Sequence, residues 1–383
     1  MPSRSTERSV PPTAKLVGEV MRSLDPRRWK ADNPTEAIAR GIHSLRSSLF
    51  TAESLSLLLV DRPPRGAKAK PPPEGSLEVT LARLRSLLEQ DAALIGSGAA
   101  PLSVLTPEAP WGHGGRLLRI LADGQTVNRR KRRRDARSFS RKARRWLPEM
   151  PSYYQRNFHY QTDGYLSDRS AELYEHQVEL LFRGGADAMR RLIVPALKLH
   201  FGDHDGHGLR FLELGSGTGI GTRSVARCFP EARITAVELS PPYSRFARRR
   251  FDDLERVDFV QGDASKLDFA EERFDAVYSI FLFHELPLPV REQVLSESLR
   301  VLKPGGFMGF VDSLQRGDDP ELDWALEFFP REFHEPYYAN YAAHPMDRLV
   351  EEAGFEAVRE GTGYLSKWLA ARKPEDESTD DRD

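Results

Sequence analysis

One short segment, a strand-like run followed by three alternating glycines, constrains the fold of this chain more than any other feature. Residues 210–219 read RFLELGSGTG, with glycines at positions 215, 217 and 219. Glycines at such a turn let the backbone approach a ligand without a Cβ clash, and a helix that begins there offers free N–H groups at its positive end. The segment therefore predicts a site for a nucleotide-like ligand at the end of a strand.

The residues around this segment alternate between strand and helix patterns, which is typical of a mostly parallel sheet with helices on both faces. Near the end of the chain, after a helix around 346–352, two strand-like runs joined by a Gly-containing turn predict an antiparallel hairpin on the sheet edge. The predicted fold class is α/β, with a doubly wound, mostly parallel, seven-stranded sheet. The other strands are expected over 210–214, 233–239, 257–263, 274–281 and 306–313, with helices over 219–228, 243–254 and 290–302.

The glycine spacing distinguishes two kinds of nucleotide site. A dinucleotide site reads G-x-G-x-x-G, but here the sixth position is Ile220 counted from Gly215 and Thr222 counted from Gly217. NAD and FAD are therefore disfavoured. The E-x-G-x-G-x-G spacing that begins at Glu213 instead resembles motif I of class I S-adenosylmethionine-dependent methyltransferases.

Further segments resemble this family in the correct order. FDAVYSIFLFHELP and LRVLKPGG resemble the fourth strand with its loop, and the helix and turn before the fifth strand, of the ubiquinone/menaquinone C-methyltransferase-like branch. The resemblance covers about residues 205–372 and implies a Rossmann-like fold with S-adenosyl-L-methionine as cofactor. It implies that Glu238 accepts hydrogen bonds from the ribose hydroxyls and that Asp263 lies at the adenine amino group. The predicted cofactor-binding residues are Glu213, Gly215, Gly217, Gly219, Glu238, Leu239, Asp263, Ala264 and Phe281.

The FHELP loop supplies the catalytic candidates. Methyl transfer from a sulfonium is an in-line displacement that depends on alignment and exclusion of water, and an acceptor with an acidic proton also needs a base. His284 is the first candidate for a base or an acceptor-orienting group, although it can equally contact only the cofactor or the loop backbone. Glu285 and His334 are further catalytic candidates. The D/N-P-P-Y motif of amino-methylating nucleic-acid enzymes is absent from this loop, which argues against methylation of exocyclic base nitrogens.

Two aromatic segments are candidates for the acceptor site. The insertion FFPREFHEPYYANYAAH follows the fifth strand, and PSYYQRNFHYQTDGY precedes the domain. Such side chains suit a pocket wall and a lid, but they serve equally well to pack both segments onto the sheet. The substrate-binding candidates are Tyr337, Tyr338, Tyr341, His344 and Tyr160, and the other lid candidates are Tyr153, Tyr154, Phe158, His159 and Tyr165.

The charges are divided unevenly along the chain. The 56 basic and 57 acidic residues almost cancel, but residues 1–150 hold 28 basic and 15 acidic residues, a net +13, which leaves −14 for residues 151–383. Eleven of the basic residues lie in RRKRRRDARSFSRKARR at 129–145. Spread over a helix, this run would attract phosphates or anionic lipid headgroups, whereas the simpler interpretation is a solvated connector.

These patterns divide the chain into four regions. Residues 1–145 are a mainly helical accessory region, with helices over 35–50 and 77–88, a Pro-rich linker at 61–76 and the basic run. Residues 146–204 are a helical lid with helices over 170–183 and 186–200, and residues 205–372 are the methyltransferase domain. Residues 373–383 are an acidic tail expected to be disordered.

The cysteine content and the apolar runs bear on metal binding and on the cellular compartment. The single Cys228 forms neither an internal disulfide nor a thiolate metal cluster, and no metal site is predicted. No apolar run approaches the roughly 20 residues that span a bilayer, and the N-terminus lacks the apolar core of a secretory signal. The expected location is cytoplasmic, although the Arg/Ser-rich N-terminus leaves an organellar transit peptide open.

Three functional hypotheses follow. The favoured one is a methyltransferase that acts on a small-molecule acceptor. The second is an RNA- or ribosome-associated methyltransferase that docks through the basic run, so nucleic acid is retained as a less favoured partner. The third is a non-catalytic, cofactor-binding interaction protein, since a fold alone does not establish catalysis.

Overall fold

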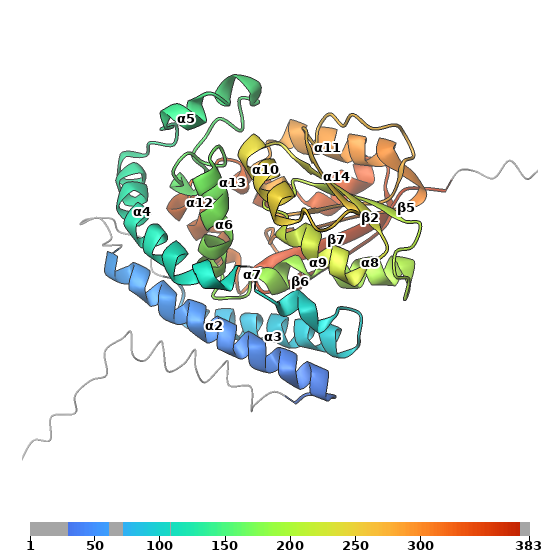
Figure 1. Cartoon of the computed structure of the whole chain (residues 1–383), viewed down its shortest axis with the longest axis horizontal. Coiled ribbons are helices and arrows are strands. Elements are labelled where there is room, and N and C mark those ends of the chain that lie inside the picture. The colour runs from blue at the N-terminus through green and yellow to red at the C-terminus, as the bar shows by residue number, and fades with distance from the viewer. Residues whose placement is uncertain (1–29, 61–71, 108, 376–383) are drawn as a thin grey trace, which may run out of the picture.

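A computed structural model describes residues 30–60, 72–107 and 109–375 of the chain. The predicted tail beyond residue 375 and most of the predicted Pro-rich linker lie outside the described residues, as do residues 1–29. Figure 1 shows helices from the N-terminal part of the chain beside an α/β region in which helices flank a sheet.

Seven strands form one sheet in the order β3-β2-β1-β4-β5-β7-β6. The strands β1 to β5 pair in parallel, and β7 lies antiparallel between β5 and β6. The predicted doubly wound sheet with an edge hairpin is therefore confirmed. Strand order reverses between β1 and β4, and open α/β sheets bind ligands in the crevice at the carboxyl ends of such strands. The strands are β1 (Arg210–Leu214), β2 (Arg233–Glu238), β3 (Val257–Gln261), β4 (Phe274–Ile280), β5 (Leu302–Ser313), β6 (Glu356–Gly363) and β7 (Ser366–Arg372).

The central strand β1 shows why its residues form a buried strand. Phe211 and Leu212 have no exposed surface, because β1 is paired on both edges and covered on both faces. Successive side chains point to opposite faces, so Phe211 joins the core beneath α8 and α9, and Leu212 joins the core beneath α11 and α14. A parallel strand covered on both faces requires such a continuous apolar run. The flanking helices are α8 (Ile193–Phe201), α9 (Ile220–Cys228), α10 (Pro241–Arg250), α11 (Leu288–Val301) and α14 (Met346–Glu352).

Two helices depart from the predicted boundaries. α10 begins at Pro241, two residues earlier than predicted, because the Ser240 side chain caps it by accepting a hydrogen bond from the Tyr243 N–H. The single helix predicted over 186–200 is two helices, α7 (Ala186–Arg190) and α8. Pro195 explains the break, because its ring clashes with a helical carbonyl four residues earlier.

The N-terminal helices are longer than predicted. α2 (Pro34–Val60) and α3 (Ser76–Gly96) contain the predicted helices and extend beyond them. In α3 the buried apolar stripe continues through Ala92 and Ile95, which stabilises the added turns. Two further helices, α4 (His113–Arg133) and α6 (Asp168–Leu181), complete this side of the molecule and pack on α2.

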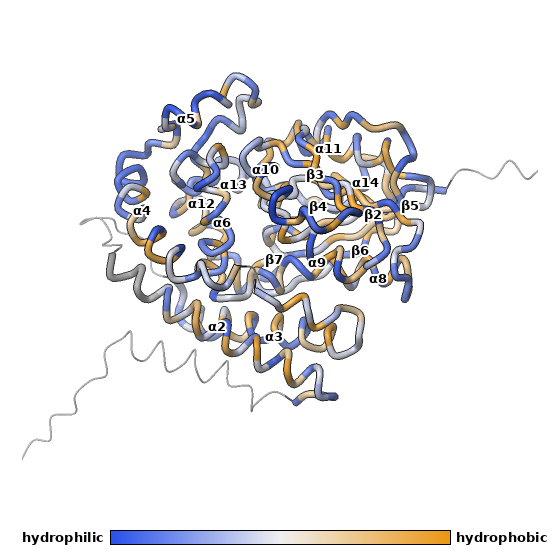
Figure 2. Tube along the Cα trace, viewed as in Figure 1, coloured by the Kyte–Doolittle hydropathy of each residue, from blue (hydrophilic) through white to orange (hydrophobic). Residues whose placement is uncertain are grey.

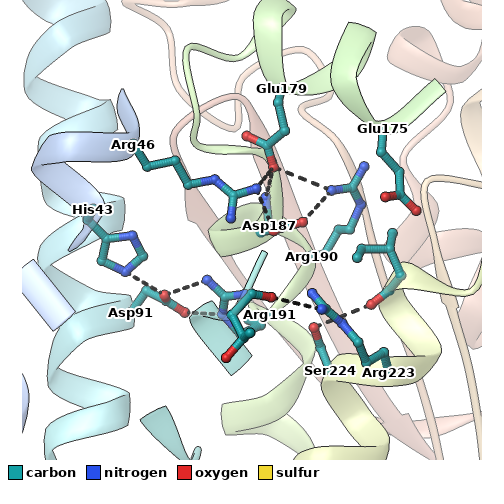
Figure 3. A network of polar contacts seen from close by, with 12 residues as sticks. His43, Arg46, Asp91, Glu175, Glu179, Asp187, Arg190, Arg191, Arg223 and Ser224 are labelled. Carbon is teal, nitrogen blue, oxygen red and sulfur yellow. Dashed lines mark hydrogen bonds and ion pairs between the residues drawn. The ribbon is translucent and has the colours of Figure 1, made fainter. Parts of the chain in front are cut away.

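Buried ion pairs attach these helices to the α/β region (Figure 3). Asp91 of α3 accepts two hydrogen bonds of 2.7 Å from Arg191, and its carboxylate lies 2.8 Å from the His43 Nε2 atom of α2. A second cluster joins Arg46 of α2 to Glu179 of α6 at 2.7 Å and to Asp187 of α7 at 2.6 Å. Except for Arg46, whose side chain is 19% exposed, these groups are nearly inaccessible, so an ionised group among them needs its partner.

The basic run does not form one helix. α4 ends at Arg133, Arg134 adopts a left-handed backbone conformation, and helical structure resumes only in the short α5 (Arg141–Arg144). Several of the charges are engaged within the chain: Arg130 donates to the Thr162 hydroxyl, and Lys131 pairs with Glu332. Figure 2 shows the stretch from the end of α4 to α5 as largely hydrophilic and away from the sheet.

A helix that crosses a bilayer needs about 20 predominantly apolar residues. No helix within residues 30–60, 72–107 and 109–375 combines the length and the apolar character needed to cross a membrane.

Candidate active site

A cavity lies at the carboxyl ends of the central strands, at the switch point between β1 and β4. Its wall includes most of the predicted cofactor-binding residues, together with one catalytic candidate, Glu285. Gly219 and Glu213 lie outside it. The residues that line it are Tyr153, Tyr154, Tyr165, Tyr174, Gly215, Gly217, Val237, Glu238, Leu239, Tyr243, Gly262, Asp263, Ala264, Phe281, Leu282, Glu285, Leu286 and Val294.

The glycine loop follows β1 directly and has left-handed backbone conformations at all three glycines. Gly217 has a φ of 57° and its N–H donates a 2.8 Å hydrogen bond to Glu238, so the loop is held against the end of β2. Gly219 has a φ of 81°, and a Cβ there would lie 2.7 Å from the Phe251 ring and 3.0 Å from the Phe259 ring. At position 219, glycine is needed because a Cβ would collide with these two rings. At position 217, glycine is needed for the left-handed backbone conformation that faces the cavity.

Glu238 ends β2 and lines the cavity. Its carboxylate accepts hydrogen bonds from the backbone N–H groups of Gly217 and Ser240, at 2.8 and 2.7 Å. Burial raises the pKa of Glu238 to about 7, although these hydrogen bonds oppose the rise. A carboxylate held in this way retains acceptor capacity for hydroxyl donors in the cavity.

Asp263 follows β3 on the neighbouring part of the wall. Its Oδ1 atom accepts hydrogen bonds from the Ser265 N–H at 2.9 Å and from the Ser265 hydroxyl at 2.7 Å. Ala264 and Gly262 line the cavity beside it. These two hydrogen bonds fix the orientation of the carboxylate. Its second oxygen is thereby oriented to accept a hydrogen bond from an amino group.

Glu213 has a structural position behind the cavity. It is 1% exposed, and the Tyr278 hydroxyl donates to it at 3.1 Å. Burial raises the pKa of Glu213 to about 7. Its side chain thus connects β1 to β4 through Tyr278.

Tyrosines from the segment before the domain cover the cavity. Tyr153, Tyr154 and Tyr165 line it, joined by Tyr174 of α6 and Tyr243 of α10. The Tyr165 ring lies 5.4 Å from that of Tyr243 and 5.9 Å from those of Tyr154 and Tyr174, measured between centroids. Such ring contacts pack the tyrosines of the cover against one another. Of the other predicted lid residues, Phe158 is buried in the same aromatic cluster, and neither it, His159 nor Tyr160 lines the cavity.

A charged cluster surrounds Glu285 in the short helix η6 (Phe283–Glu285) after β4. The Tyr165 hydroxyl donates to Glu285, and His159 lies 3.0 Å from that hydroxyl and 3.7 Å from the carboxylate. Glu335, whose side chain has no exposed surface, lies 2.9 Å from the other ring nitrogen of His159. Against the effect of burial, Glu335 and Glu285 raise the pKa of His159 to about 10. At neutral pH the cluster therefore holds a protonated imidazole between two carboxylates.

His284 is adjacent in sequence but does not line the cavity. Its Nδ1 atom lies 2.6 Å from Asp312 of β5, and the other Asp312 oxygen accepts the Phe283 N–H at 2.7 Å. Although burial opposes it, Asp312 raises the pKa of His284 to about 9. The His284 imidazolium and Asp312 thus fix the backbone of η6 and orient Glu285, from which His284 Nε2 is 3.9 Å.

The comparison with known proteins agrees with this geometry. Residues 211–306, which include the glycine loop, Glu238 and Glu285, match the protein family described as a methyltransferase domain. Over these residues the chain is similar to a methyltransferase domain. The methyl donor of such domains is S-adenosylmethionine, and the glycine loop, Glu238 and Asp263 all line the same cavity.

Curated relatives are similar to less than half of this chain. Fatty-acid O-methyltransferase of Mycolicibacterium smegmatis is 32% identical over 171 residues, which are 44% of this chain and 61% of that protein. A probable phthiotriol/phenolphthiotriol dimycocerosates methyltransferase of Mycobacterium ulcerans is 40% identical over 106 residues, 27% of this chain and 40% of that protein. Demethylmenaquinone methyltransferase of Clavibacter sepedonicus is 40% identical over 99 residues, 26% of this chain and 39% of that protein. The chain thus spans less than two thirds of the length of each.

The predicted acceptor-binding residues do not line the cavity. The Tyr338 and Tyr341 hydroxyls donate to Ser313, at 3.1 and 2.6 Å, and thereby attach α13 (Tyr338–Ala343) to the end of β5. Tyr337 donates to the Tyr153 backbone at 3.3 Å, and His344 contacts the backbone of its own helix. The insertion therefore packs on the sheet through these residues. His334 and Tyr160 contact each other, with ring centroids 5.4 Å apart.

Several residues of the site were not predicted as such. Asp312 and Glu335 complete the charged cluster, and Tyr174 and Tyr243 complete the cover. The sequence does contain a signal that could have identified Asp312 as a site residue, because it is an acidic residue near the carboxyl end of a predicted core strand. It contains no such signal for Glu335, since a glutamate beside a histidine in an insertion is usually exposed.

Proposed function

We propose that this chain transfers a methyl group from S-adenosylmethionine to a small, largely apolar acceptor of the lipid or quinone class. The observation that carries the proposal is one cavity that combines the cofactor determinants with an aliphatic and aromatic wall around Glu285. The apolar part of that wall includes Phe281, Leu282, Leu286 and Val294. The relatives support this class, since their names specify fatty-acid, dimycocerosate and demethylmenaquinone acceptors.

Within this proposal, Glu285 is the proton acceptor. Bound S-adenosylmethionine supplies an electrophilic methyl group. Glu285 takes the proton of an acceptor hydroxyl while the new oxygen–carbon bond forms and the carbon–sulfur bond breaks, which leaves a neutral thioether. The Tyr165 hydroxyl and protonated His159 hold the Glu285 carboxylate in place before transfer.

We assign His284 a positioning role and not that of the base. An imidazole with a pKa of about 9 is protonated at neutral pH, and its Nδ1 atom is occupied by Asp312. Its contribution is to hold η6 so that Glu285 faces the cavity. The quinone branch suggested by the FHELP loop remains part of the proposal, because the same wall suits a ring-bearing acceptor.

Methyl transfer from labelled S-adenosylmethionine to long-chain fatty acids, long-chain phenols and demethylated quinols tests the proposal. We expect a labelled product with at least one class and, for a phenol or quinol acceptor, a kcat lowered about 100-fold or more in Glu285→Gln with little change in cofactor affinity. Glu292→Gln on the exposed side of α11 is the matched control and should retain full activity. Cofactor binding without a product from any of the three classes, or from a total lipid extract, would contradict the proposal and favour the non-catalytic hypothesis.

A further inference from the structure

A second cluster of ionisable side chains lies far in sequence from the methyltransferase site. Glu53 of α2, His113 at the start of α4 and His176 of α6 meet where the three helices pack. One Glu53 carboxylate oxygen lies 2.6 Å from His113 Nε2, and the other lies 3.1 Å from His176 Nε2. The ligand atoms of the three residues all lie within 4.8 Å of one another.

The chemistry of this set matches that of a borderline-soft divalent metal. Two imidazole nitrogens and one carboxylate are a ligand set that Zn²⁺ uses when it keeps a fourth position open. Tetrahedral bonds of about 2.0–2.1 Å place ligand atoms about 3.3 Å apart, close to the separations between Glu53 and the two histidines. The ligand atoms already lie within 4.8 Å of one another, so small side-chain rotations are sufficient to bring them into coordination with one ion.

The surroundings of the cluster shield it from solvent. The side chain of His176 is 2% exposed and that of Glu53 is 10% exposed, so few water molecules compete for an ion. The His113 and His176 rings are 4.4 Å apart, which brings the two imidazoles together at Glu53.

The cluster also opens onto a second cavity. His113 and His176 line a space of about 920 Å³ between the N-terminal helices and α9 and α10, separated from the methyltransferase cavity by α6. A metal held by the three residues would expose its remaining coordination position to this space. The second cavity has apolar walls from α2, including Leu49 and Phe50, beside Arg116 and Arg249.

We propose that Glu53, His113 and His176 bind one divalent transition-metal ion of the zinc class, with an open coordination position that faces the second cavity. The ion joins α2, α4 and α6. This site is independent of the proposed methyl transfer, because none of its ligands lines the methyltransferase cavity.

Titration of the chelator-treated full chain with Co²⁺ and Zn²⁺ tests the site. We expect one equivalent of Co²⁺ to give the intense visible d–d bands of tetrahedral coordination, and Zn²⁺ to displace it with one-to-one stoichiometry. His113→Ala is the main variant, because its side chain is 29% exposed and its loss is tolerated by the fold better than that of His176. We expect this variant to weaken Zn²⁺ binding about 100-fold or more, and Glu53→Gln to do the same.

The exposed loop with His204 and His207 provides the matched control, since surface histidines bind metals adventitiously. The double variant His204→Ala/His207→Ala should leave the tight site unchanged. Circular dichroism and thermal melting of His113→Ala without metal establish that it is folded, and only the wild type should gain melting temperature on addition of Zn²⁺. The proposal is overturned if the wild type binds no stoichiometric ion, or if His113→Ala retains wild-type affinity while the loop variant loses it.

Discussion

At the residue scale, the protonation of Glu238 should govern cofactor affinity. Its pKa is raised to about 7 by burial, and only the ionised carboxylate accepts hydrogen bonds on all of its lone pairs. Cofactor binding favours the ionised form, so affinity should fall up to about tenfold for each pH unit below about 7 and level off above it.

Isothermal titration with S-adenosylhomocysteine from about pH 5.5 to about pH 8.5 measures this dependence. Glu238→Gln should bind more weakly at high pH and lose most of the pH dependence. An unchanged slope in that variant would assign the effect to another group. Glu231→Gln, an exposed change before β2, is the matched control.

Two successive residues show what side-chain direction adds to sequence. His284 and Glu285 were both predicted as catalytic candidates from one loop, yet Glu285 lines the cavity and His284 is held by Asp312. The difference comes from the tight turn of η6, in which neighbouring side chains point in different directions. Motif order located the loop, but its backbone conformation determined which residue faces the ligand.

At the element scale, the buried pair of Asp91 and Arg191 should be a main attachment of α3 to the domain. Asp91→Asn leaves the Arg191 guanidinium, 1% exposed, without its carboxylate. We expect a loss of about 3–5 kcal/mol in the free energy of unfolding, as for other broken buried pairs. Urea denaturation measures it, and Glu89→Gln in the partly exposed i,i+4 pair with Arg85 should change stability by less than about 0.5 kcal/mol. A small effect of Asp91→Asn would show that α3 is attached mainly by apolar contacts.

The elements also differ in how far sequence predicted them. The strands β1 to β4 were predicted within two residues, because buried parallel strands have continuous apolar runs with glycines and acids at their ends. The lengths of α2 and α3 and the break before α8 were not predicted, since tertiary packing extends a helix and a single proline interrupts one. The basic run was considered as one helix, but Arg134 turns the chain within it.

At the scale of the whole molecule, the buried ion pairs predict that the N-terminal helices and the sheet unfold together. Far-UV circular dichroism and tryptophan fluorescence should give coincident urea transitions, since Trp111 and Trp146 precede the domain and Trp324 and Trp368 lie within it. Two separate transitions in the wild type would mean that the helical region is an independent unit. Asp91→Asn is expected to separate them, because it weakens the connection and leaves both cores intact.

The sequence by itself determined the α/β class, the glycine loop, and the positions of Glu238 and Asp263. These depend on local patterns, namely periodicity and residue types at strand ends, which a chain displays in its linear order. Only the tertiary structure decided which side chains meet: Glu285 with Tyr165 and His159, and Glu53 with His113 and His176. These partners are contributed by separate helices and loops, and their convergence depends on packing angles and side-chain directions, which a local pattern does not specify.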